Sequence, residues 1–126
     1  MRRPRSPAEV AAWSWDRTAF HYNVADFLDE FRRVADPAAL ADEPALLRGR
    51  FEGGDVADAY LAAVAVSLAR EIGCVPPGWV LQSLRRVERP WFAHPGAALR
   101  AMLLAESPAP FRERNLFVSA NALSRA

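Results

Sequence analysis

Residues that bind metals or act as nucleophiles are few and scattered in this sequence. The imidazole and thiol groups belong to His21, Cys74 and His94, which lie far apart along the chain. Zinc sites need three or four converging ligands and usually show spacings such as Cys-x-x-Cys or His-x-x-x-His, and neither spacing occurs. The sequence also has no glycine-rich phosphate loop and no Gly-x-Ser-x-Gly turn. We therefore expect no metal site and no cofactor.

Acidic residues cluster in three places, and each cluster is a candidate for general acid–base chemistry. The clusters are Asp26 with Asp29 and Glu30, Asp42 with Glu43, and Asp55 with Asp58. At helical spacing these carboxylates lie opposite the apolar stripes, whereas acid–base catalysis needs an apolar cleft that shifts their pKa. The pattern favours solvated helix faces, so we expect that the protein is not an enzyme. A small enzyme that uses an acidic helical face is the less favoured interpretation.

A helix-turn-helix pattern is centred on residues 69–87. Ala69, Gly73 and Trp79 match the small residue, the turn glycine and the apolar residue of that motif. Pro76-Pro77-Gly78 has more proline than such a tight turn usually contains, and Gln82 stands where another apolar residue is expected. The basic residues that would contact DNA come late, and they are Arg85, Arg86 and Arg89. A DNA-binding autoregulator is therefore our alternative interpretation, with operator DNA as its partner.

Aromatic and arginine side chains are interleaved in the last third of the chain. Protein-binding surfaces favour this mixture because aromatic rings and guanidinium groups contribute most of the binding energy there. Phe117 and Leu123 fit a terminal core equally well. The interface hypothesis assigns partner binding to Trp91, Phe92, Phe111, Arg112, Arg114 and Phe117.

The spacing of apolar residues and prolines predicts an all-α fold. Apolar residues recur three and four positions apart over residues 20–34, 55–72 and 97–106, as in helices with one buried face. The alanine-rich segment 55–72 is the candidate for a central buried helix, capped by Asp55 and ended by Gly73. Shorter helices are predicted over residues 7–15, 37–40, 43–48, 79–87 and 108–114, several of them opened by proline. A strand over residues 115–118 is less favoured because no partner strand is evident.

Length and composition indicate one compact domain. The chain has 126 residues, 52% of them hydrophobic, and a formal net charge of +1. All 16 basic residues are arginine, which is typical of a GC-rich bacterial genome. The single cysteine and the absence of an apolar leader predict a cytoplasmic protein with no membrane segment. We expect residues 1–6 to form a flexible basic arm and residues 7–126 to form a single helical domain, a bundle of two or three longer helices and several short proline-capped ones.

Three motifs stand out in the second half of the chain: Arg89-Pro90-Trp91-Phe92, Glu106-Ser107-Pro108 and the run from Phe111 to Val118. Together with the rest of the chain from residue 55 to the C-terminus and with the segment 26–31, they resemble small bacterial proteins that are encoded beside nucleotidyltransferase-like proteins, in pairs that look like toxin–antitoxin systems. The resemblance implies an antitoxin-like module that neutralises a nucleotidyltransferase-type toxin by binding it. It implies no catalytic residue and leaves the oligomeric state open.

Overall fold

The computed structural model describes residues 2–124, and most of them are helical. Predominant helix was predicted, but the term all-α is wrong because two short strands form a parallel sheet. In chain order, the helices are α1 (Pro7–Trp13), α2 (Arg17–Val34), α3 (Gly54–Glu71), α4 (Ala97–Glu106) and α5 (Ala109–Arg112), the 3₁₀ helices are η1 (Pro37–Leu40), η2 (Gly78–Leu81) and η3 (Ser83–Arg85), and the strands are β1 (Trp91–Phe92) and β2 (Leu116–Phe117).

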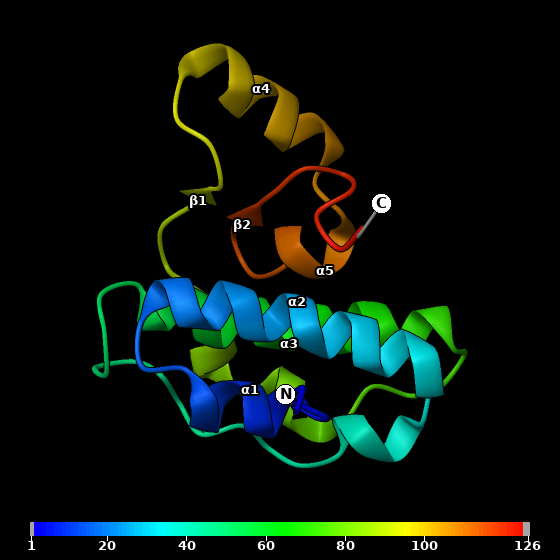
Figure 1. Ribbon diagram of the computed structural model, residues 1–126. Coiled ribbons are helices and arrows are strands. Elements are labelled where there is room, and N and C mark those ends of the chain that lie inside the picture. Colours follow the sequence, from blue (N-terminus) through cyan, green and yellow to red (C-terminus); the bar gives the residue numbers. More distant parts are fainter. Residues whose placement is uncertain (1, 125–126) are drawn as a thin grey trace.

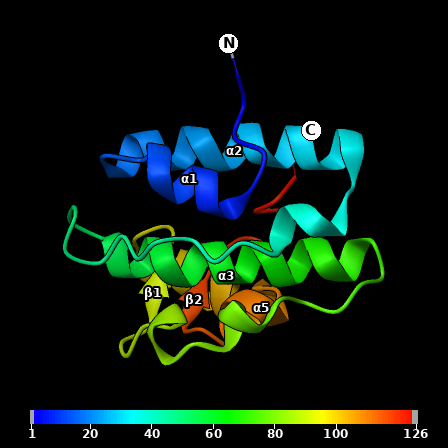
Figure 2. The ribbon, with the colours of Figure 1, turned by 90° about the horizontal axis from the view of Figure 1, so that it is seen from below.

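Helix α3 forms the centre of the molecule. In Figure 2 it lies between α1 and α2 on one side and α5 with the two strands on the other. Twelve of its residues are buried, which confirms the prediction of a central buried helix. Its N-cap is Gly53, at φ 87°, so the prediction that Asp55 caps the helix was wrong. Gly54 is packed so closely that a Cβ atom there would lie 2.1 Å from the Leu47 carbonyl oxygen.

Short polar side chains begin the helices of the N-terminal half. The Ser6 Oγ accepts the Glu9 backbone N–H at 3.1 Å, and Pro7 occupies the first turn of α1, as predicted. The Asp16 carboxylate accepts the Ala19 N–H at 2.8 Å and starts α2. The Asp36 carboxylate does the same for η1. These caps fix the layer of α1 and α2 that covers one side of α3.

Two predicted helices are replaced by other conformations. Residues 43–47 have no regular structure, because the buried Asp58 carboxylate accepts the N–H groups of Leu47 and Arg48 at 2.6 and 3.1 Å. Residues 79–87 form η2 and η3 with an extended residue, Gln82, between them. The Trp79 Nε1 donates to the Leu40 carbonyl at 2.9 Å, which ties this segment to η1.

The sheet pairs two segments that are distant in sequence. Trp91 is in register with Leu116, and Phe92 with Phe117. Asn115 sets the start of β2: its φ is 64°, and its side-chain amide donates to the Val87 carbonyl at 3.0 Å. The strand that was weighed at 115–118 therefore exists, and its partner is the segment that follows Pro90.

The segment before α1 contacts the body through Glu9, through the Arg2 guanidinium over the Trp13 ring, and through Pro4. Glu9 accepts the Arg5 backbone N–H at 2.9 Å and forms an ion pair with Arg2, and Pro4 is buried. Whether the arm moves in solution stays a prediction. Met1 and residues 125–126, which fall within the predicted arm and domain, lie outside the described residues.

Candidate functional site

Two of the aromatic rings predicted to bind a partner lie in the core. Phe111 is 1% exposed and its ring meets Tyr60 of α3 edge-on, with 5.1 Å between the centroids. Phe117 is 8% exposed and stacks on Phe92, also at 5.1 Å. The Phe111 ring joins α5 to α3, and the Phe117 ring joins β2 to β1. Trp91 and Phe92 are half-buried and lie at the edge of this packing.

The two arginines of the same predicted surface bind backbone carbonyls. Arg114 is buried, and its guanidinium donates to Pro110 at 2.8 Å and to Val80 at 3.1 Å. Burial lowers the pKa of this guanidinium from its ordinary value. Arg112 is exposed and donates to the Ser107 carbonyl at 2.6 Å. The six predicted residues therefore do not form one exposed surface, because Phe111, Arg114 and Phe117 are interior residues.

The three arginines of the DNA-binding alternative are divided between the interior and the surface. Arg85 is fully buried, whereas Arg86 and Arg89 are exposed. The segment that carries them consists of short 3₁₀ turns and extended residues, so it provides no recognition helix for a major groove.

Arg85 belongs to a buried polar network centred on Asp58. The Arg85 Nη1 lies 3.7 Å from the Asp58 Oδ1, and the Arg85 Nη2 donates to the Pro44 carbonyl at 2.6 Å. Burial raises the pKa of the Asp58 carboxyl above its usual value, and its two N–H donors and Arg85 counteract this in part. The prediction that Asp58 lies on a solvated face was wrong. A sequence signal did exist, since Asp58 is the lone charged residue inside the apolar run 56–69.

Metal-ligating side chains do not gather within residues 2–124. No group of three or more His, Cys, Asp or Glu residues is close enough there to hold a metal ion. Burial and the Arg17 charge lower the pKa of His21. His94 is exposed and Cys74 is half-buried.

The most unusual surface of the molecule is helix α4. It stands apart from the layers of α2 and α3 in Figure 1. Eight of its ten residues are apolar, yet its one buried residue is Leu103. Leu99, Met102 and Leu104 are 42%, 46% and 48% exposed. A helix that is apolar around its whole circumference is ordinarily buried, so α4 lacks the cover that its composition calls for within residues 2–124.

Helix α4 is nevertheless held firmly at both ends. At its C-terminal end, the Ser107 Oγ donates to the Leu116 carbonyl at 3.0 Å and accepts the Val118 N–H at 3.2 Å. In its first turns, the Arg100 guanidinium lies over the Phe92 ring, 4.8 Å from the centroid. The outer face, formed by Ala98, Ala101, Met102, Leu104 and Ala105, is thus presented on a fixed base.

No protein-family model matches the chain, and neither a curated protein nor a solved structure matches it. Among the described residues, no helix combines the length and the apolar character needed to cross a bilayer.

Proposed function

We propose that the protein is a protein-binding module that inserts helix α4 into an apolar groove on a partner protein. The proposal rests on one observation: helix α4 is mostly apolar, yet Leu103 is its one buried residue. Its outer face places alanines between Met102 and Leu104, so that a partner can approach the helix backbone closely. Helix-in-groove recognition uses such short apolar helices as anchors.

The charges on α4 favour a protein groove over a lipid surface. Helices that lie on membranes carry a basic polar face, whereas α4 has a single arginine, and Arg100 is already engaged with Phe92. Covering Leu99, Met102 and Leu104 would contribute roughly 1 kcal/mol each, since each is about half exposed. That contribution suits an interface anchored by a few side chains.

The partner that we propose is a nucleotidyltransferase-type toxin, in keeping with the resemblance described above. In this role the module is an antitoxin, and α4 covers an apolar groove beside the toxin's active site. The proposal therefore assigns partner binding to α4 and no longer to the C-terminal aromatic and arginine residues. Operator binding is not part of the proposal, because Arg85 is buried and the segment around it is not a recognition helix.

Co-expression with a nucleotidyltransferase-like protein tests the proposal. We expect the wild-type chain to co-purify with that protein and to relieve its toxicity. The double variant Met102→Arg/Leu104→Arg should bind at least about tenfold more weakly, because two charges would be buried in the interface. Val75→Arg is the matched control, since Val75 is 89% exposed in the turn after α3.

Three outcomes contradict the proposal. The first is no complex with the wild-type chain at micromolar concentrations. The second is equal loss of binding in Val75→Arg and in the double variant. The third is sedimentation of the chain alone as a dimer that Met102→Arg/Leu104→Arg dissociates, which would assign the α4 face to a second copy of the chain.

A further inference from the structure

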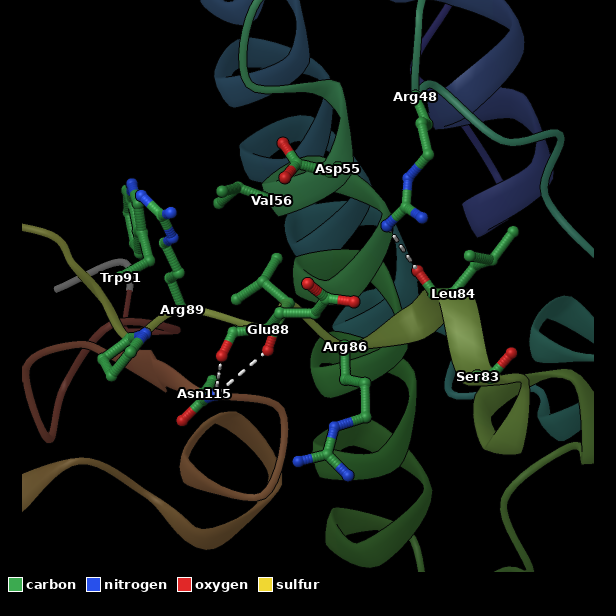
Figure 3. Close-up of a pocket in the computed structure, with 12 residues that line it drawn as sticks. Arg48, Asp55, Val56, Ser83, Leu84, Arg86, Glu88, Arg89, Trp91 and Asn115 are labelled. Carbon is green, nitrogen blue, oxygen red and sulfur yellow. Dashed lines mark hydrogen bonds between the residues drawn. The ribbon is translucent and has the colours of Figure 1, made fainter.

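A cleft of about 840 Å³ lies on the molecule at the N-terminal end of α3. Its walls are the first turn of α3, the chain from residue 83 to residue 91, and the side chain of Arg48 (Figure 3). Pockets of roughly 300–1,000 Å³ accommodate small organic ligands. We call this hollow the arginine cleft, because Arg48, Arg86 and Arg89 line it.

In Figure 3 the three guanidinium groups lie at separate parts of the cleft: Arg89 lies beside Trp91, Arg48 points toward Leu84, and Arg86 points away from both. Arg86 and Arg89 make no hydrogen bond or ion pair to any other described residue. The Arg48 guanidinium donates one long hydrogen bond of 3.4 Å, to the Leu84 carbonyl. A guanidinium group offers a fork of N–H donors that matches phosphate and carboxylate oxygens, so these groups are available to an anion.

The backbone around these arginines is fixed. The Asn115 Nδ2 donates to the carbonyls of Val87 and Glu88 at 3.0 and 3.2 Å, between Arg86 and Arg89. The backbone N–H of Arg48 is held by the buried Asp58 at 3.1 Å. The cleft therefore keeps its form without a ligand, which lowers the entropy cost of binding one.

The other side chains of the cleft restrict the class of anion. Asp55 and Glu88 supply carboxylate acceptors, and the half-buried indole of Trp91 lies beside Arg89 (Figure 3). The ionised side chains of an acidic peptide are acceptors only, so they would be repelled by Asp55 and Glu88. A nucleoside phosphate has phosphate oxygens for the arginines, hydroxyl and amino donors for the carboxylates, and a flat base for the indole.

We propose that the arginine cleft binds a nucleoside phosphate unit, either as a free nucleotide or within a single-stranded nucleic acid. Arg89, which lies beside Trp91, binds the phosphate, and the base stacks on Trp91. Arg48 and Arg86 add positive charge at the other sides of the cleft. Asp55 and Glu88 accept hydrogen bonds from the sugar or the base. This site is separate from α4 and does not depend on the function proposed for that helix.

Calorimetric titration of the full chain with the four nucleoside 5′-monophosphates, inorganic phosphate and a short oligoadenylate tests this inference. We expect saturable binding of at least one nucleotide at millimolar or lower concentration. Arg89→Ala should weaken it about tenfold, the contribution of one charge-assisted hydrogen bond, and Arg86→Ala should weaken it less. The matched control is Arg70→Ala, an exposed arginine at the far end of α3, which should bind like the wild type.

A second variant separates the base from the phosphate. Trp91→Leu should weaken nucleotide binding and leave the binding of inorganic phosphate unchanged, since a leucine cannot stack on a base. Tighter binding of oligoadenylate than of the mononucleotide would assign the ligand to a nucleic-acid strand, and the reverse would assign it to the free nucleotide.

The inference is overturned by any of three results. These are no saturable binding of any nucleotide or oligonucleotide, equal weakening by Arg70→Ala and Arg89→Ala, or tighter binding of a polyglutamate peptide than of every nucleotide. The last result would identify an acidic segment of a protein as the ligand.

Discussion

Helices α3 and α4 are alike in composition and opposite in surroundings. Both are rich in alanine, leucine and valine or methionine, and both are apolar over most of their circumference. The rest of the molecule encloses α3, whereas α4 buries Leu103 alone among its ten residues. Such a composition in α3 serves the core of the chain itself. In α4 the outer face of Ala98, Ala101, Met102, Leu104 and Ala105 is left uncovered by residues 2–124, which is the basis of the proposal that another molecule covers it.

The two helices also differ in where their charged side chains lie. Helix α3 contains a fully buried carboxylate, Asp58, whose acceptors are used by two backbone N–H groups and which lies beside Arg85. Helix α4 has no buried charge, and its arginine and glutamate both remain near the surface. The enclosed helix is thus tied to its neighbours by polar contacts, and the uncovered helix is free on its outer face.

The strongest test of the enclosed side is the removal of the Asp58 carboxylate. Asp58→Ala should lower the free energy of unfolding by about 3–5 kcal/mol, because it leaves the Arg85 charge and two backbone N–H groups buried without their acceptor. Urea denaturation measures this loss. Asp55→Ala, in the exposed first turn of the same helix, is the control and should cost less than about 1 kcal/mol. Equal effects of the two variants would mean that the buried network does not stabilise α3.

The close approach of the chain to α3 can be broken at Gly54. Gly54→Ala should destabilise the fold by about 3 kcal/mol, since the new Cβ would overlap the Leu47 carbonyl and force the backbone apart. Thermal unfolding provides the measurement. Gly78→Ala has no heavy atom within 4 Å of the added Cβ, so its unfolding temperature should stay near that of the wild type. A harmless Gly54→Ala would contradict the packing described here.

The contrast can be sharpened within α4 itself. Leu103→Ala should cost about 2–4 kcal/mol, because it removes the buried anchor of the helix. Leu104→Ala, one residue further along the chain, should cost less than about 1 kcal/mol, since its side chain is 48% exposed. Chemical denaturation of the two variants compares the inner and outer sides directly. A similar loss from both would show that α4 is covered in the isolated chain.

The smallest expected effect concerns His21 on α2, the helix that covers one side of α3. Because the pKa of His21 in the folded chain is lowered from 6.5, the unfolded chain binds the proton more readily. The contribution of this group to stability is complete above pH 6.5 and decreases as the pH falls toward the lower folded pKa. Unfolding at pH 7.5 and pH 5.5 should therefore show a slightly smaller pH dependence in His21→Gln than in the wild type. An NMR titration midpoint above 6.5 would contradict the lowered pKa.

Local sequence signals predicted the features that depend on neighbouring residues. Ser6-Pro7 and Asp36-Pro37 gave the starts of α1 and η1, and Gly73 adopts the left-handed conformation expected after α3. The bounds of α4 were predicted correctly from its apolar spacing and the following Ser107-Pro108. These signals act over a few residues, so no knowledge of the tertiary structure was needed.

Apart from the wrong N-cap of α3, the incorrect predictions involve contacts between distant segments. Residues 43–48 lost their predicted helix to the Asp58 carboxylate, and the β1–β2 pairing joins residues 25 positions apart, Trp91 and Leu116. Burial of Phe111 depends on Tyr60, which lies on another helix. The exposure of α4 was missed for the same reason, since its pattern predicts a helix but not whether a neighbour covers it.

Hydrogen exchange of the α4 amides, measured with and without a bound nucleotidyltransferase-type partner, tests the central claim most directly. In the free chain, we expect the amides of residues 97–106 to exchange faster than those of α3, because one side of α4 faces solvent. The partner should slow exchange across α4 and leave the core of α3 unchanged. A complex that protects other segments and leaves α4 unaffected would contradict the account.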